Sequence, residues 1–255
     1  MEKISQPPIE ELFQESYRQV LHIGFALFII PLRWFGFWYA IEIAIFAFFW
    51  NLIIMPRWFK DSFRPLEKQK GYSTGMLVYP ISILVMAVIF PLPIMAAGWA
   101  VLSVSDGFAT LFGKLLGKRH LPWNKNKTWI GTFSFWISAA IFGWLAIMWT
   151  AKNMDGSSIF SHQFTGWLMY ARVYFLWPIS EATAHIEFFL SYSLQDPYFL
   201  LVASFIAAAG AAMIESLPIA KLDDNLVAPL CFSLFILLIF TYESLYVLYN
   251  PIVGQ

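Results

Sequence analysis

Charged residues are scarce in this chain. Only 13% of its 255 residues are charged, about half the share found in a typical soluble domain, whereas 59% are hydrophobic. The formal net charge is zero, which argues against a nucleic-acid partner held by a broadly basic surface. The composition therefore predicts an integral membrane protein.

Cysteine is also nearly absent. The one cysteine, Cys231, lies in an apolar run, so the sequence offers neither a disulfide framework nor a cysteine-based metal site. The N-terminal stretch is polar and acidic and has no short apolar core followed by a cleavage site, so we expect no signal peptide. It also lacks an Arg- and Ser-rich leader, which favours a bacterial plasma membrane over a chloroplast.

Long apolar segments are what the chain has in abundance. A helix needs roughly 20 apolar residues to cross a bilayer. No flexible linker separates the segments, so we predict one membrane-embedded domain over residues 1–255, an all-α polytopic bundle of about seven transmembrane helices. Residues 151–195 contain an apolar piece, 164–179, that is interrupted by Arg172, and this region could lie along the interface or add a pair of short spans. The predicted spans are 19–32, 36–55, 76–92, 93–113, 129–150, 196–216 and 226–249.

Basic residues between the spans predict the orientation of the chain. The loops 56–74 and 114–128 each hold five Lys or Arg residues, and such loops face the cytoplasm. Counting spans places Arg18, His22 and the loop 217–225 on the same side. Four polar clusters should therefore meet at one membrane face.

One of these clusters contains a stripe of small residues that begins with an acid. Asp106, Ala109, Gly113 and Gly117 are three, four and four residues apart, so they share one face of a helix. Small residues allow close approach of either a neighbouring helix or a ligand. For Gly113 and Gly117 alone, helix packing is the simpler interpretation.

Basic residues surround this stripe. Lys114 and Lys118 each follow a glycine, and Lys127 and Thr128 follow the turn at Pro122. Anchoring at the membrane edge explains the lysines but requires neither glycines nor an acid. Cations and amides beside small residues suit phosphate groups, so the pattern favours a nucleoside triphosphate as ligand.

Acidic residues supply the oxygen ligands that a divalent metal beside a triphosphate needs. Asp106 lies in an apolar run, where a carboxylate is costly and usually functional. Magnesium prefers such oxygens, and Asp106, Glu215, Asp223 and Asp224 are the candidates. For Asp223 and Asp224 the alternative is a solvated turn that caps the next helix, and for His22 it is a packed, hydrogen-bonded core histidine.

At these residues the chain resembles the superfamily of phytol kinase, dolichol kinase and phosphatidate cytidylyltransferase. The segments 215-ESLPIAKLDDNLVAPL-230, 18-RQVLHIG-24 and 75-GMLVYP-80 resemble the CTP-dependent lipid kinase branch in particular. Residues 151–195 have no counterpart in this pattern and read as an insertion. The superfamily's Asp, Ala, Gly, Gly-Lys, Lys-Thr and Gly pattern is similar to Asp106, Ala109, Gly113, Gly117, Lys118, Lys127, Thr128 and Gly131.

The resemblance implies transfer of the γ-phosphoryl group of CTP to the hydroxyl of a membrane lipid alcohol of the phytol, polyprenol or diacylglycerol type, at the cytoplasmic face. We expect Mg²⁺, or Mn²⁺, to be held by Asp106, Glu215, Asp223 and Asp224. Asp106, His22 and Glu215 are the expected catalytic residues. The expected nucleotide-binding residues are Gly113, Lys114, Gly117, Lys118, Lys127, Thr128 and Asn225.

Two other functions stay open at this point. A cytidylyltransferase would join CMP to a lipid phosphate and release pyrophosphate from a similar nucleotide pocket. A non-catalytic membrane scaffold or transporter would keep the apolar spans and bind no CTP. The Asp-Asp-Asn-Leu segment, 223–226, favours the kinase.

Overall fold

The computed structural model describes residues 18–59, 63, 65–151, 196–218 and 223–249. Within these ranges every regular element is a helix, and the only β feature is an isolated bridge between His120 and Thr128. The predicted all-α membrane fold is thereby confirmed. Residues 152–195, which hold nearly all of the predicted insertion, lie outside the described ranges, and the single domain over 1–255 stays a prediction.

The helices follow the predicted apolar segments closely. The chain begins with a helix over Arg18–Ile29, whose last turn is η1 (Phe25–Ile29). Two longer helices each contain a π turn, one over Trp50–Ile54 and one over Val101–Ser105. The remaining elements are α2 (Leu32–Phe49), η2 (Trp50–Ile54), α3 (Met55–Trp58), α4 (Pro65–Lys70), α5 (Thr74–Ile89), α6 (Leu92–Ala100), η4 (Val101–Ser105), α7 (Asp106–Leu116), α8 (Trp129–Ala151), α11 (Pro197–Ser216) and α12 (Asp224–Tyr249).

Five of these helical stretches are long and apolar enough to cross a membrane. The other two predicted spans correspond to shorter apolar helices, Arg18–Ile29 and Thr74–Ile89, so length alone supports five crossings of the predicted seven. The five are Leu32–Trp58, Leu92–Leu116, Trp129–Ala151, Pro197–Ser216 and Asp224–Glu243.

The centre of the bundle is the continuous helix formed by α6, η4 and α7. In the most apolar 18-residue stretch of this helix 78% of the residues are buried, compared with 17% in the corresponding stretch of Leu32–Trp58. Trp99 and Met95 on this helix are almost completely buried, as is Phe135 on α8. α11 contributes small buried residues such as Ala207. Small residues let membrane helices pack closely, which matters because the hydrophobic effect does not drive helices together inside lipid.

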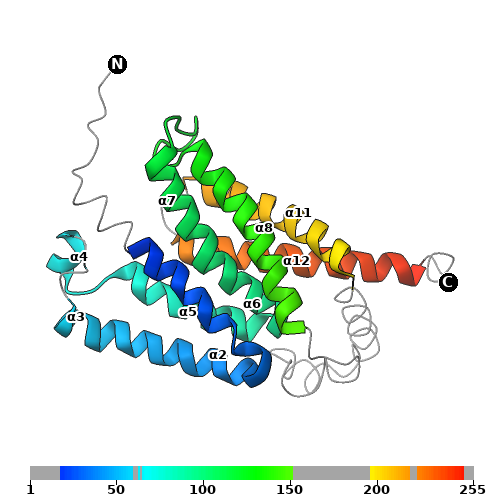
Figure 1. Ribbon diagram of the computed structural model, residues 1–255, viewed down its shortest axis with the longest axis horizontal. Coiled ribbons are helices and arrows are strands. Elements are labelled where there is room, and N and C mark those ends of the chain that lie inside the picture. Colours follow the sequence, from blue (N-terminus) through cyan, green and yellow to red (C-terminus); the bar gives the residue numbers. More distant parts are fainter. Residues whose placement is uncertain (1–17, 60–62, 64, 152–195, 219–222, 250–255) are drawn as a thin grey trace.

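Helix ends of opposite direction gather on one side of the molecule. Figure 1 shows the starts of α5, α8 and α12 and the ends of α7 and α11 on its left-hand side. Local signals fix several of these ends. Ser73 accepts a hydrogen bond from the Met76 amide at the start of α5, and Pro91 and Pro93 bracket the start of α6. The polar residues between the spans are thereby delivered to one side of the bundle.

Candidate active site

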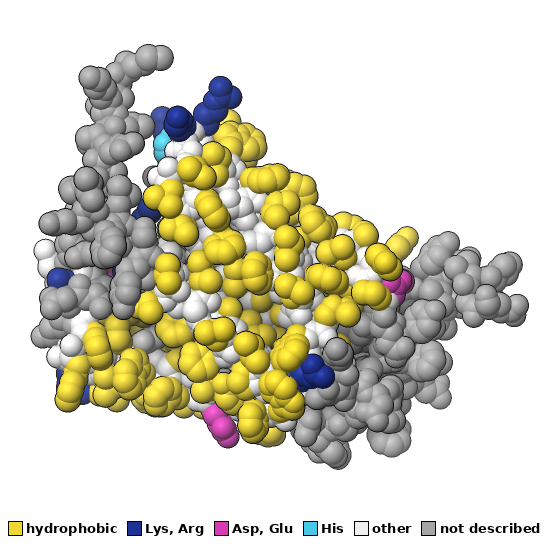
Figure 2. Space-filling model, in the orientation of Figure 1, with side chains coloured by type: hydrophobic (Ala, Val, Ile, Leu, Met, Phe, Trp, Pro, Cys, Tyr) yellow, Lys and Arg dark blue, Asp and Glu magenta, His cyan; other side chains and the backbone are white. Residues whose placement is uncertain are grey.

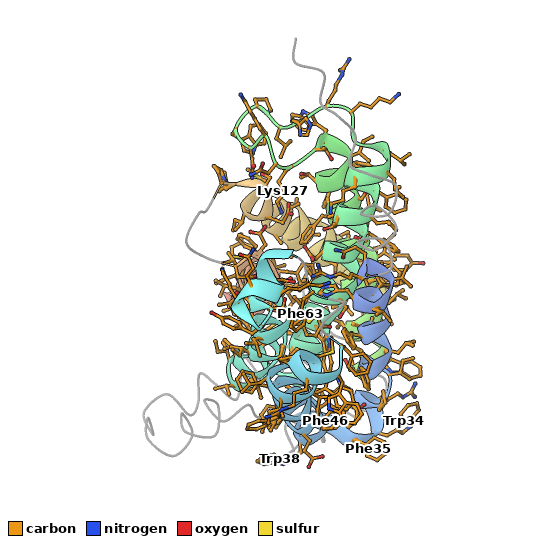
Figure 3. All side chains as sticks on the ribbon, turned by 90° about the vertical axis from the view of Figure 1, so that its left-hand side faces the viewer. Trp34, Phe35, Trp38, Phe46, Phe63 and Lys127 are labelled. Carbon is orange, nitrogen blue, oxygen red and sulfur yellow. The ribbon has the colours of Figure 1, made fainter. Side chains whose placement is uncertain are left out.

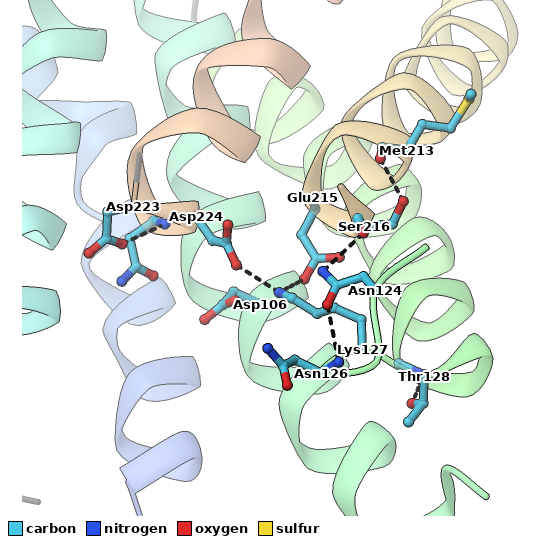
Figure 4. A network of polar contacts seen from close by, with 12 residues as sticks. Asp106, Asn124, Asn126, Lys127, Thr128, Met213, Glu215, Ser216, Asp223 and Asp224 are labelled. Carbon is cyan, nitrogen blue, oxygen red and sulfur yellow. Dashed lines mark hydrogen bonds and ion pairs between the residues drawn. The ribbon is translucent and has the colours of Figure 1, made fainter. Parts of the chain in front are cut away.

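A lysine from the loop after α7 lies between two carboxylates from the last two helices. The ammonium of Lys127 pairs with Glu215 at the end of α11 and with Asp224 Oδ2, 2.7 Å away, at the start of α12 (Figure 4). Burial lowers the pKa of Lys127, but the charges and hydrogen bonds of Glu215 and Asp224 outweigh burial and raise it above its ordinary value. Lys127 is therefore a fixed positive charge at neutral pH.

The loop that carries Lys127 is attached to the end of α11. Asn124 donates through Nδ2 to the carbonyl oxygen of Ser216 at 3.1 Å, and Trp123 donates through Nε1 to the Ser216 hydroxyl at 3.1 Å. Asn124 Oδ1 also accepts from the Asn126 amide, which closes the turn. Because Ser216 directly follows Glu215, these contacts hold Lys127 beside that carboxylate. The sequence analysis missed Asn124 and Trp123, although 122-PWNKNKT-128 has the composition of an ordered turn.

The two carboxylates that pair with Lys127 lie at opposite ends of helix dipoles. Glu215 is 4% exposed and lies at the C-terminal end of α11, where the helix dipole disfavours a negative charge. Asp224 lies in the first turn of α12, where the dipole favours one. Glu215 therefore depends on Lys127 for compensation. Among the described residues its second oxygen, Oε2, is buried without a hydrogen-bond partner.

Asp223 is placed differently from its neighbour. Its carboxylate accepts a hydrogen bond from the Asn225 amide at 3.0 Å, and its carbonyl accepts from Leu226 at 2.9 Å. These are the contacts of an N-cap. The structure therefore gives Asp223 the helix-capping role that the sequence left as an alternative.

His22 and Asp106 form a pair next to this cluster. His22 Nε2 lies 2.9 Å from the carbonyl oxygen of Leu102 and 3.7 Å from Asp106 Oδ2. Since a carbonyl oxygen only accepts, Nε2 carries a hydrogen and faces both oxygens. Figure 4 shows Asp106 in the same group of side chains as Lys127, close enough for the charges of Lys127 and Asp224 to act on it.

The π turn of the central helix ends at Asp106. The Asp106 amide bonds to the carbonyl of Val101, five residues back, rather than four as in an α-helix.

A network of buried hydrogen bonds lies behind His22. The Trp99 indole donates to the Tyr79 hydroxyl at 2.9 Å, Tyr79 lies 2.6 Å from Ser103 Oγ, and Ser103 donates to the Trp99 carbonyl. The Tyr79 ring meets the His22 ring edge-on, with 5.0 Å between centroids. This buried ring of hydrogen bonds supports His22 and escaped the sequence analysis.

The small-residue stripe packs against α8. A Cβ on Gly113 would lie 3.2 Å from Thr128 Oγ1, and a Cβ on Gly131 would lie 2.9 Å from the Ala109 carbonyl. Thr128 itself is buried and accepts from the Gly131 amide at 3.1 Å, which caps α8. Gly113, Gly117 and Thr128 therefore bring α7 and α8 into close contact, and any contact of these residues with a nucleotide stays a prediction.

The other candidate residues lie around the rim. Lys114 and Lys118 are exposed at the end of α7, and Asn225 lies in the first turn of α12, close to Gly75 of α5. Among the described residues, no three His, Cys, Asp or Glu side chains already converge as a metal site. The predicted metal ligands Asp106, Glu215 and Asp224 are instead arranged around the Lys127 ammonium, and metal binding stays a prediction.

The fold and this cluster define a class: a polytopic helical membrane protein with a charged centre between helix ends at one face. Three curated plant proteins resemble the chain. It is 27% identical to a probable chloroplastic phytol kinase of Triticum aestivum over 176 residues, 68% of this chain and 46% of the relative. It is 28% identical over 160 residues to probable phytol kinase 3 of Glycine max, covering 61% and 38% of the two chains.

The third relative is probable phytol kinase 1 of Oryza sativa, chloroplastic, 37% identical over 75 residues, which are 29% of this chain and 24% of the relative. The chain is thus distantly similar to proteins named as probable phytol kinases. The matches span about a quarter to a half of the relatives' own lengths. No family model and no solved structure matches. The relatives are named chloroplastic, so the comparisons give no support to the expected bacterial plasma membrane.

Proposed function

We propose that this chain is a lipid alcohol kinase that transfers the γ-phosphoryl group of CTP to the hydroxyl of a membrane alcohol such as phytol. The observation that carries the proposal is the meeting of Lys127, Glu215 and Asp224 beside the His22–Asp106 pair. Phosphoryl transfer demands mainly positioning and neutralisation of charge, and this cluster supplies fixed charges of both signs. The names of the three relatives favour phytol or a similar alcohol as acceptor.

Each residue of the cluster has a distinct role in this proposal. In the reaction an alcohol oxygen bonds to the γ-phosphorus, the bond to the β–γ bridging oxygen breaks, and CDP leaves. Asp106 accepts the hydroxyl proton, and His22, whose Nε2–H donates to the Leu102 carbonyl, lies 3.7 Å from Asp106 Oδ2 as its electrostatic partner. Lys114 and Lys118, exposed at the rim, attract the phosphates from the aqueous side.

A divalent ion fits the donors that the site offers. Glu215 Oε2 is buried without a partner among the described residues, and Asp224 is partly exposed, so hard oxygen ligands face the cluster. Glu215 and Asp224 would hold Mg²⁺, and Asp106 would lie beside the ion as the base. The ion, when bound, would neutralise charge on the transferring phosphoryl group.

The position of the cluster suits an insoluble acceptor. It lies where the end of α11 and the start of α12 meet the start of α7, and Lys127 reaches it from the loop between α7 and α8. A lipid alcohol can present its hydroxyl there while its chain stays in the bilayer, and a nucleotide can approach from water.

The proposal is tested with the full chain in lipid nanodiscs, supplied with radiolabelled CTP, Mg²⁺ and phytol, farnesol or diacylglycerol. We expect a lipid phosphate and CDP in equal amounts. Asp106→Asn should abolish the product. Asp196→Asn, an equal change at a helix cap away from the cluster, should retain it, because asparagine also caps helices. Pyrophosphate release from CTP and a lipid phosphate would instead establish a cytidylyltransferase.

A further inference from the structure

A second carboxylate lies within a membrane span, far from the cluster described above. Glu42 is exposed on α2, six residues after the kink at Gly36, and lies inside the apolar span Leu32–Trp58. Among the residues that the structure describes it has no hydrogen bond or ion pair. A carboxyl group inside such a span is costly in lipid even when protonated, because hydrocarbon offers it no hydrogen-bond partner.

The side chains on either side of Glu42 form a regular exposed stripe. Trp38, Ile45 and Phe49 are 58%, 43% and 52% exposed, and with Glu42 they are separated by four, three and four residues. This is the spacing of the a and d positions at which two helices pack in a left-handed pair. The stripe lies on the regular part of α2, between the kink at Gly36 and the π turn at Trp50–Ile54.

The rest of the α2 surface leaves this stripe accessible. Figure 2 shows hydrophobic side chains covering the lower edge of the molecule, and Figure 3 shows Trp34, Phe35, Trp38 and Phe46 along that edge. Trp34 and Phe35 are more than half exposed. Lipid can cover such aromatic residues without penalty, so they do not by themselves indicate a partner. Glu42 is the residue that lipid leaves unsatisfied.

We propose that α2 is the contact surface for a second copy of this chain, and that the Glu42 carboxyl groups of the two copies hydrogen-bond to each other. Two copies inserted in the same orientation are related by a two-fold axis along the membrane normal. Every residue near that axis then meets its own counterpart at the same depth. A protonated carboxyl has one donor and a free acceptor, so it is complementary to itself. A single polar residue in an apolar seam also fixes the register of the two helices.

Self-association is measured by energy transfer between fluorescently labelled copies of the full chain in phosphatidylcholine vesicles, as a function of protein-to-lipid ratio. We expect wild-type dimers, and Glu42→Leu should raise the dissociation constant about tenfold or more. Glu42→Gln should restore most of the affinity, because two amides can also pair with each other. Circular dichroism of each variant in the same vesicles reports whether it is folded.

Cysteine cross-linking tests the geometry. In a Cys231→Ser background, Ile45→Cys should form a disulfide between copies. Ile206→Cys, on the exposed face of α11, should not, although Ile206 is 58% exposed and Ile45 only 43%. A monomeric wild type, equal association of wild type and folded Glu42→Leu, or equal cross-linking at both positions would overturn the proposal.

Discussion

Two membrane spans of this protein each contain one carboxylate and one π turn, yet their surroundings differ greatly. Leu92–Leu116 runs through the centre of the bundle, and its Asp106 meets His22 and the charges around Lys127. Leu32–Trp58 runs along the edge, and its Glu42 has no partner among the described residues. The same rare residue type thus has charged partners in one span and none among the described residues in the other, and on this difference we propose a reaction centre in the first span and a contact surface in the second.

The sharpest test of this difference is to remove the charge of the central carboxylate. Asp106→Asn should lower kcat/KM for phosphoryl transfer about 10²–10⁴-fold, the usual contribution of a general base, while the protein stays folded. Initial rates of lipid phosphate formation measure the effect. If a folded Asp106→Asn variant kept its rate, Asp106 would be an unreactive, half-buried acid and the proposed reaction centre would be wrong.

The second test removes the cation from the central cluster. Lys127→Met leaves the buried Glu215 without compensation and should destabilise the protein by about 3 kcal/mol. The pKa of Lys127 is raised in the folded state, so its contribution is complete below its ordinary pKa of about 10.4 and is lost as pH rises through the higher folded value. Thermal unfolding of both proteins should therefore differ at pH 8 and differ less in strong alkali. The double variant Lys127→Met, Glu215→Gln should recover part of the loss.

The close packing of the central span can be tested at a glycine. A Cβ at Gly131 would lie 2.9 Å from the Ala109 carbonyl, so Gly131→Ala should push α7 and α8 apart and cost about 1–3 kcal/mol. A Cβ at Gly24 meets nothing within 4 Å, which makes Gly24→Ala the matched control. Unfolding in a denaturant series compares the two. Equal stability of both variants would show that the α7–α8 contact adjusts at little cost.

The smallest expected effect separates a cap from a metal ligand. Asp223→Ala should cost about 1 kcal/mol through loss of the α12 cap, whereas Asp223→Asn should retain the stability. Thermal unfolding measures the first effect, and the magnesium dependence of the kinase rate provides the second readout. Should Asp223→Asn need as much additional magnesium as Glu215→Gln, Asp223 would be a ligand of the ion as well as a cap.

Much of the architecture was predictable because each membrane-spanning helix requires a long run of apolar residues. All seven predicted segments correspond to helices, and the span count placed 217–225 on the same side as the loop 114–128, in which Lys127 indeed meets Asp224. The number of crossings was less predictable, because Arg18–Ile29 and Thr74–Ile89 are apolar but short.

Within the site, the residue types in the sequence predicted which residues would lie close together better than they predicted what each residue contacts. Sequence spacing identified the stripe with Gly113 but could not decide between a ligand and a helix as its neighbour. The structure shows α8 there. The lysine expected at a phosphate pairs with two acids, and Asn124 and Trp123 were missed because their partner, Ser216, lies more than 90 residues away.

The attachment of Lys127 also has a consequence for biogenesis. Glu215 and Asp224 follow Lys127 by 88 and 97 residues, so they are synthesised well after the loop that needs them. During translation Lys127 therefore has neither of these two partners until α11 and the start of α12 have been synthesised. The nascent chain can therefore complete its charged centre only after the start of α12 has been synthesised.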